Sequence, residues 1–116
     1  MKVKKAAEVQ ESPVNMEGTK DTSMRLLLSE QDGAPNFAMR MFTVKPGGHT
    51  PFHFHNYEHE VYVLAGRGVL KGEDREHVFE AGDVIFVAPN EKHQFRNAGD
   101  SDLQFLCLIP AADKCG

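Results

Sequence analysis

The chain has 116 residues and a formal net charge of −4, with acidic and basic residues interspersed along its length. This length favours a single domain, and the lack of a basic stripe argues against nucleic-acid binding. We expect no secretory leader and no membrane-spanning segment, and therefore a cytoplasmic protein without a membrane partner. The two cysteines, Cys107 and Cys115, are too few for a disulfide framework.

Two regions of the chain differ in composition. Residues 1–24 are polar and are predicted to form an N-terminal arm with room for one strand, whereas residues 25–116 are predicted to form a single β-barrel domain. In the second region, short apolar or alternating runs are separated by Gly, Pro, Asn or Asp at intervals of roughly 8–12 residues. This pattern predicts an all-β, antiparallel sandwich or barrel. The predicted strands are residues 25–29, 37–44, 60–64, 69–71, 77–79, 84–87, 93–96 and 103–109.

Histidines are concentrated between the second and third predicted strands. His53 and His55 are two residues apart, so on a strand their rings would share one face. His59 and Glu60 are adjacent and would face opposite sides of a strand, so only one of them is expected to bind the same ion. His93 follows a Pro-Asn turn that can bring it to the same place. Because imidazole suits first-row transition metals, a metal site is predicted; a solvated histidine-rich loop is the alternative.

These residues resemble the two motifs of the cupin superfamily. The likeness covers about residues 37 to 109, and the spacer before Gly66 is one residue short. In the second motif Pro89 is displaced by one position and Asn90 replaces a glycine, so a local difference before His93 is expected. The resemblance implies a double-stranded β-helix, also called a jelly-roll barrel. The matching residues are Gly47, His53, His55, Glu60 and Gly66 in the first motif and Gly82, His93 and Asn97 in the second.

A closer resemblance is to small, single-domain, manganese-binding cupins of bacteria, in which four histidines hold the metal. By this likeness the ligands are His53, His55, His59 and His93, and Glu60 is the alternative third ligand of the commoner cupin scheme. The implied cofactor is a divalent transition metal, with manganese first and iron, nickel, copper or zinc as alternatives. A six-coordinate ion held by four protein ligands would keep two open positions for a substrate.

Side-chain alternation suggests which residues face the barrel interior. Phe105, Cys107 and Ile109 share one face of the last predicted strand and are expected to line a substrate pocket, with plain core packing as the alternative. Arg40 would bind an anion if it faced this pocket, although solvent exposure is the default for an arginine.

Three functions fit these observations. The leading hypothesis is a metal-dependent oxidoreductase, dioxygenase-like, acting on a small-molecule substrate. The second is a non-catalytic metal-binding or small-molecule-binding module, such as a sensor, and the third is a closed structural zinc site. By resemblance to small cupins, the protein is expected to be a homodimer.

Overall fold

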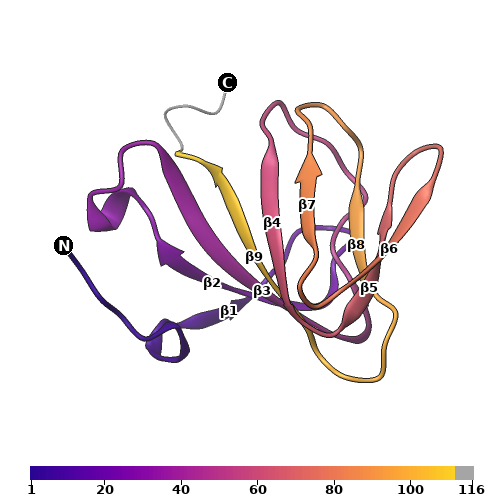
Figure 1. Ribbon diagram of the computed structural model, residues 1–116, viewed down its shortest axis with the longest axis horizontal. Coiled ribbons are helices and arrows are strands. Elements are labelled where there is room, and N and C mark those ends of the chain that lie inside the picture. The colour runs from indigo at the N-terminus through magenta and orange to yellow at the C-terminus, as the bar shows by residue number, and fades with distance from the viewer. Residues whose placement is uncertain (112–116) are drawn as a thin grey trace.

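The computed structural model describes residues 1–111, and these form nine strands and two single-turn 3₁₀ helices, η1 (Ala6–Glu8) and η2 (Glu30–Asp32). All strand pairs are antiparallel, and the sheet curls into a half-barrel (Figure 1). The predicted all-β jelly-roll class is thereby confirmed. The strands are β1 (Glu11–Pro13), β2 (Lys20–Leu28), β3 (Phe37–His49), β4 (His59–Ala65), β5 (Arg67–Lys71), β6 (Glu76–Glu80), β7 (Val84–Val87), β8 (Gln94–Asn97) and β9 (Leu103–Pro110).

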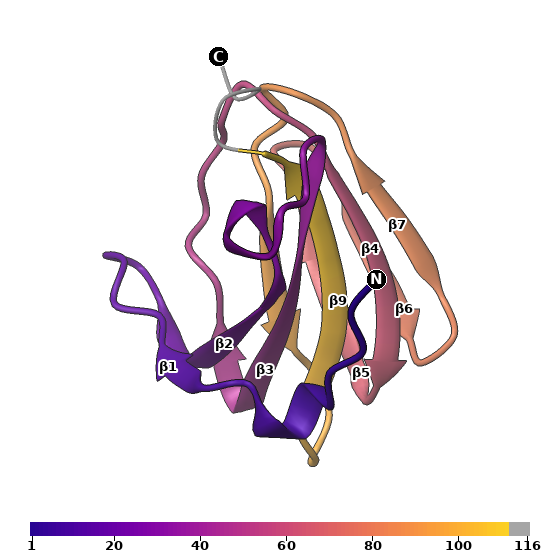
Figure 2. The same ribbon diagram turned by 90° about the vertical axis from the view of Figure 1, so that its left-hand side faces the viewer.

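Strands far apart in the sequence are neighbours in this sheet. Its order is β6-β5-β8-β3-β9-β4-β7, and β2 adds to β3 while β1 adds to β2. The long strand β3 pairs with β9 along most of its length and reaches β8 at His49. In the turned view, β2, β3, β9 and β4 follow one another around the curved wall (Figure 2).

The core lies on the concave face because apolar residues alternate along the strands. In β4, Val61 and Val63 are buried while Tyr62 and Leu64 are exposed, which is the two-residue period of a sheet covered on one face. The same alternation places His59 on the buried side. The core cluster consists of Val44, Val61, Val63, Phe79, Val87, Phe95, Leu103, Phe105 and Cys107.

The predicted N-terminal arm lies along the outer edge of the sheet. It contains η1, β1 and the first residues of β2, which begins at Lys20, within the segment predicted as arm. Arg25 of β2 donates hydrogen bonds to the Val9 and Ala7 carbonyls, and Lys4 forms an ion pair with Asp32 at 2.7 Å. These contacts fix the arm to its own barrel. Among the described residues, no helix is long and apolar enough to cross a membrane.

Candidate metal centre

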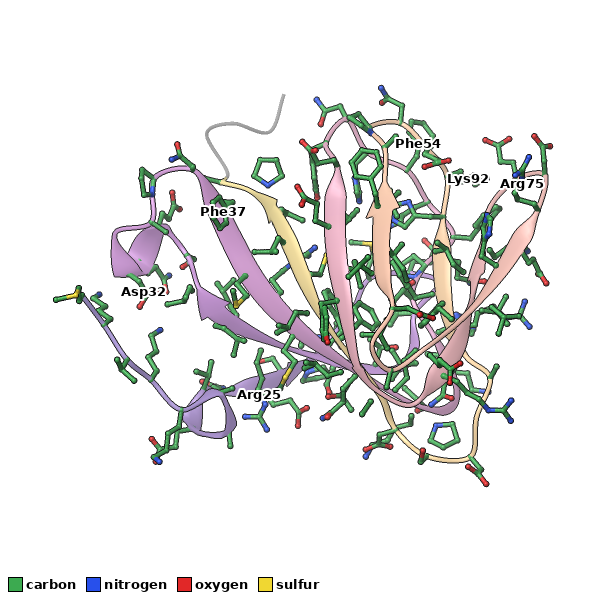
Figure 3. The ribbon with its side chains drawn as sticks, viewed as in Figure 1. Arg25, Asp32, Phe37, Phe54, Arg75 and Lys92 are labelled. Carbon is green, nitrogen blue, oxygen red and sulfur yellow. The ribbon has the colours of Figure 1, made fainter. Side chains whose placement is uncertain are left out.

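Two backbone segments carry the predicted metal ligands. His53 and His55 lie between β3 and β4, His59 is the first residue of β4, and His93 immediately precedes β8. His53 and His55 do not lie on a regular strand, since His53 forms only an isolated bridge with His93. The alternation of side chains nevertheless persists, because Phe54 between them is 62% exposed (Figure 3).

Backbone hydrogen bonds join the two segments. His53 and His93 exchange amide-to-carbonyl bonds of 3.1 and 2.9 Å, and the Asn90 amide donates to the His55 carbonyl at 2.7 Å. Asn90 has a φ of 67°, a left-handed conformation that asparagine tolerates better than most residues. This conformation explains how asparagine can stand where the cupin motif has glycine. The side chains are therefore held together by the fold itself.

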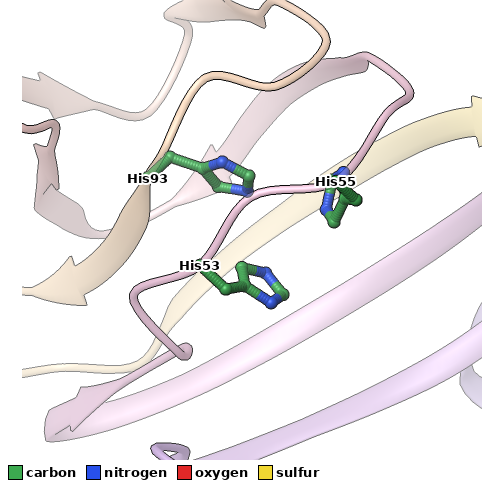
Figure 4. A group of neighbouring side chains, drawn as sticks. All are labelled: His53, His55 and His93. Carbon is green, nitrogen blue, oxygen red and sulfur yellow. The ribbon is translucent and has the colours of Figure 1, made fainter.

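The rings of His53, His55 and His93 form a compact group (Figure 4). Their ring centroids are 5.0 to 5.2 Å apart, and one nitrogen of each lies within 4.8 Å of the others. His59 lies beside this group, with its Nε2 at 2.8 Å from His55 Nε2 and its ring centroid 5.0 Å from that of His93. With metal–nitrogen bonds of about 2.1 Å, two nitrogens on one ion are at most about 4.2 Å apart. The nitrogens of His53, His55 and His93 are therefore close to the spacing that one ion requires, whereas His59 is not part of this group of three.

Carbonyl groups orient two of the rings. His93 Nδ1 donates to the Glu91 carbonyl at 2.8 Å, and His55 Nδ1 donates to the Tyr57 carbonyl at 3.2 Å. Because a carbonyl only accepts, Nδ1 carries the proton in both rings and the Nε2 lone pair is free. This arrangement is the one that metal-binding histidines use.

His59 is oriented by different partners. Its Nδ1 is 2.9 Å from Cys107 Sγ and 3.4 Å from an Arg40 terminal nitrogen. Burial raises the pKa of the Cys107 thiol, so the sulfur is uncharged near neutral pH. If the Nδ1–H group of His59 donates to this sulfur, the Nε2 lone pair of His59 is free to bind an ion. In the other tautomer, the Nε2–H group of His59 donates to His55 Nε2. Metal binding would select the first tautomer.

Burial keeps the four imidazoles neutral. It lowers the pKa of His53, His55, His59 and His93 below the usual value, and His59 falls to about 2 with a further contribution from the positive charge of Arg40. Neutral imidazoles have the lone pairs that a metal ion requires. The group is therefore ready to accept a cation near neutral pH.

Glu60 and Ile109 lie away from this group. Glu60 is exposed on the outer face of β4, opposite His59, as the alternation of a strand requires. Glu60 and Ile109 both line a separate groove near Phe37. Ile109 shares a strand face with Cys107 and packs against the core cluster, but it is not among the residues that line the central cavity. The expectation that Ile109 lines the central pocket is corrected accordingly.

A cavity of about 440 Å³ opens beside the histidines. Among the described residues that line it, aromatic and aliphatic side chains predominate and no aspartate or glutamate occurs. Arg40, Phe105 and Cys107 all line it, and for Arg40 this is the alternative to the solvent exposure that is the default for an arginine. Phe42 could also have been found, since it shares a face of β3 with Arg40, whereas no sequence signal indicates Val14 or Met16 from the arm. The other lining residues are Met24, Thr50, Pro51, His53, Phe54, His55, Tyr57, His59, His93 and Phe95.

The protein is a curled antiparallel β-barrel with a histidine group in its interior. The comparison with known families assigns it to a class with this architecture. Residues 40–109 match the model of the cupin domain, so the chain belongs to the cupin family.

Individual relatives differ in what they do. The chain is 36% identical to the oxalate-binding protein of Thermotoga maritima, over 82% of this chain and 81% of the relative. It resembles the structure of the polyketide cyclase RemF from Streptomyces resistomycificus with a TM-score of 0.89 and 37% identity, covering 95% of this chain and 79% of that one. It is 34% identical to 1-methylthio-D-xylulose 5-phosphate methylsulfurylase of Rhodospirillum rubrum, over 63% of this chain and 47% of the relative. Family membership alone thus does not define the reaction.

Proposed function

We propose that this protein is a metal-dependent cupin in which His53, His55, His59 and His93 hold one divalent transition-metal ion. The observation that carries this proposal is the convergence of neutral imidazoles at an otherwise mostly apolar cavity. Manganese is the ion we propose, with iron, nickel, copper and zinc as alternatives, because nitrogen donors alone do not discriminate among them. The substrate is a small organic molecule with oxygen donors.

The donor set fits such an ion. All four imidazoles are neutral, and the Nδ1 atoms of His55 and His93 donate to carbonyl groups, which leaves Nε2 available in both. His59 would bind through Nε2 in the tautomer whose Nδ1–H donates to Cys107. When bound, the ion would supply a Lewis acid that polarises oxygen atoms of the substrate. Four imidazole ligands leave its charge of +2 uncompensated, which favours an anionic substrate.

Two reaction classes remain candidates. Dioxygenase-type oxidation, in which O₂ is consumed along with the substrate, is the class predicted from the sequence. A Lewis-acid reaction without O₂ is the second, and the name of one relative, a polyketide cyclase, favours it. The name of another relative, an oxalate-binding protein, favours binding without turnover. A binding module without turnover is the non-catalytic alternative.

Metal content tests the ligand set. Protein loaded with Mn²⁺ and freed of excess ion should retain about one manganese per chain, with an electron paramagnetic resonance signal that reports exchangeable water. His53→Ala and His93→Ala should lose the ion, whereas His77→Ala, which removes an exposed histidine outside the group, should retain it. Full metal content in the first two variants, or a preference for zinc without exchangeable water, would contradict the proposal.

Turnover then separates the reaction classes. Small dicarbonyl compounds and dicarboxylic acids should be incubated with loaded protein in air and under argon, with O₂ uptake and product formed recorded together. Uptake of O₂ in proportion to product supports dioxygenase-type oxidation. Equal product under argon supports the Lewis-acid class, and binding without product supports the binding module.

A further inference from the structure

Arg40 lies beside the histidine group and not in solvent. It stands on β3 opposite Cys107 of β9, and one terminal nitrogen is 3.2 Å from Cys107 Sγ and 3.4 Å from His59 Nδ1. The guanidinium carbon lies 4.9 Å from the centre of the Phe42 ring, a distance typical of a cation–π contact. These three contacts fix the guanidinium at the wall of the cavity.

This cation has no anionic partner in the part of the chain that the structure describes. No ion pair of Arg40 occurs among residues 1–111, and its Nε is buried without a hydrogen-bond partner. Among the described residues that line the cavity, Arg40 is also the only arginine or lysine, and no aspartate or glutamate occurs there. A partly buried guanidinium without a counter-ion is unfavourable, so a bound anion would stabilise this arrangement.

The cavity wall beside Arg40 is apolar and aromatic. The Phe42 and Phe105 rings are stacked with centroids 5.3 Å apart, and Phe105, which is only 1% exposed, is also stacked with Phe95 at 4.8 Å. Phe42 is only partly buried, so it is the ring of this stack that a ligand can contact. A ligand that reaches Arg40 would therefore place an apolar part of its body against Phe42.

We propose that Arg40 binds an anionic oxygen group, such as a carboxylate, of a ligand whose apolar body lies against Phe42. This inference rests on the proposed function, because a second oxygen of the same ligand would face the histidines and their ion. Arg40 thereby selects anions over neutral molecules of the same shape. The substrate class is an organic anion with an apolar body and a neighbouring oxygen donor.

Salicylate is a suitable probe, and 2-hydroxybenzyl alcohol is its neutral counterpart of nearly the same shape. Calorimetric titration should compare the two in manganese-loaded wild-type protein, Arg40→Met and Arg40→Lys. Arg40→Met should weaken salicylate binding by about 10-fold or more, the scale of a lost hydrogen bond to a charged group, and should leave the alcohol within about 3-fold. Arg40→Lys, which keeps the charge, should retain part of the affinity.

The controls separate this inference from the proposed function. Each variant is first checked for cooperative thermal unfolding and for manganese content. Binding of 2-hydroxybenzyl alcohol then shows that the cavity is intact. If Arg40→Met does not fold, Arg40→Gln replaces it. Equal salicylate affinity in wild type and Arg40→Met, with manganese bound in both, overturns the inference and leaves the metal site standing. Absence of salicylate binding to the wild type also overturns it. Failure to bind manganese instead overturns the proposed function, and the salicylate comparison in metal-free protein still tests Arg40.

Discussion

Asn97 illustrates how a residue of the cupin motif can be structural without touching the metal site. Its buried side-chain amide donates to the Val44 and Ser101 carbonyls at 2.8 Å each and accepts from the Gly99 amide at 2.8 Å. Two of these bonds satisfy backbone groups in the turn between β8 and β9, and the third joins this turn to Val44 of β3. His93, four residues earlier, has its side chain in the histidine group instead. The motif therefore combines one candidate ligand with one residue that fixes the following turn.

Acidification should destabilise the metal-free protein through its buried histidines. The unfolded chain binds protons at a histidine pKa near 6.5, whereas burial lowers the pKa of His59 and His93 in the folded state. The unfolded state therefore takes up more protons as the pH falls below about 6.5, and the free energy of unfolding decreases. A fully shifted histidine contributes a slope of about 1.4 kcal/mol per pH unit. Urea unfolding between pH 7.5 and 5.5 measures this slope.

A matched pair of variants provides the control for this slope. His59→Asn should flatten the decline, and His77→Ala, which removes an exposed histidine outside the site, is the control. A free energy of unfolding that stays constant from pH 7.5 to 5.5 would show that these imidazoles accept protons in the folded state.

At the scale of the elements, two turn glycines with similar backbone angles differ in their surroundings. Gly66, between β4 and β5, has a φ of 83°, and an added Cβ would lie 2.6 Å from the Asp102 carbonyl oxygen. Gly82, between β6 and β7, has a φ of 95° but would find nothing within 4 Å. Both alanine variants incur the cost of a left-handed residue, about 1 kcal/mol, and Gly66→Ala adds a backbone clash. Gly66→Ala should therefore lower the free energy of unfolding more than Gly82→Ala in urea titrations; an equal or smaller loss would contradict this geometry.

Most strands could be predicted from the sequence because alternation and turn residues are local signals. The run at 84–87 matches β7 residue for residue, and the 103–109 run matches β9 within one residue. The same alternation places His59 and Glu60 on opposite faces of the strand. Alternation along a strand does not indicate which part of the strand borders the cavity. For this reason the sequence alone placed Ile109 in the central cavity.

The rest of the site depends on contacts that local patterns do not encode. The spacing of His53 and His55 indicates a shared face only if they lie on a strand, but their segment is held by a bridge to His93 and a hydrogen bond from Asn90, both far along the chain. Likewise, Val14 and Met16 reach the cavity only because the arm folds back along β2. Arg40 faces inward, against the default for arginine, because the register between β3 and β9 places it opposite Cys107.

For the whole molecule, the outer face of β4 and β7 carries exposed apolar side chains beside Glu60, and we propose it as the interface of the expected homodimer. Tyr62 pairs with Val84 and Glu60 with Phe86 across these strands, and Val84 and Phe86 are 74% and 61% exposed. Apolar groups gathered on one sheet face commonly mark an interface. We therefore predict a dimer in light scattering at micromolar concentration, and a monomer for Phe86→Glu. Lys45→Glu, an exposed change on β3, should leave the dimer intact. A monomeric wild-type protein would contradict this prediction.

The most direct test of the account is a crystal structure of manganese-loaded protein with anomalous diffraction recorded at the manganese edge. We predict one anomalous peak per chain, surrounded by the Nε2 atoms of His53, His55, His59 and His93, with Glu60 outside the coordination sphere. Rings turned towards bulk solvent with no peak between them, or a peak bound by the Glu60 carboxylate in place of His59, would contradict it.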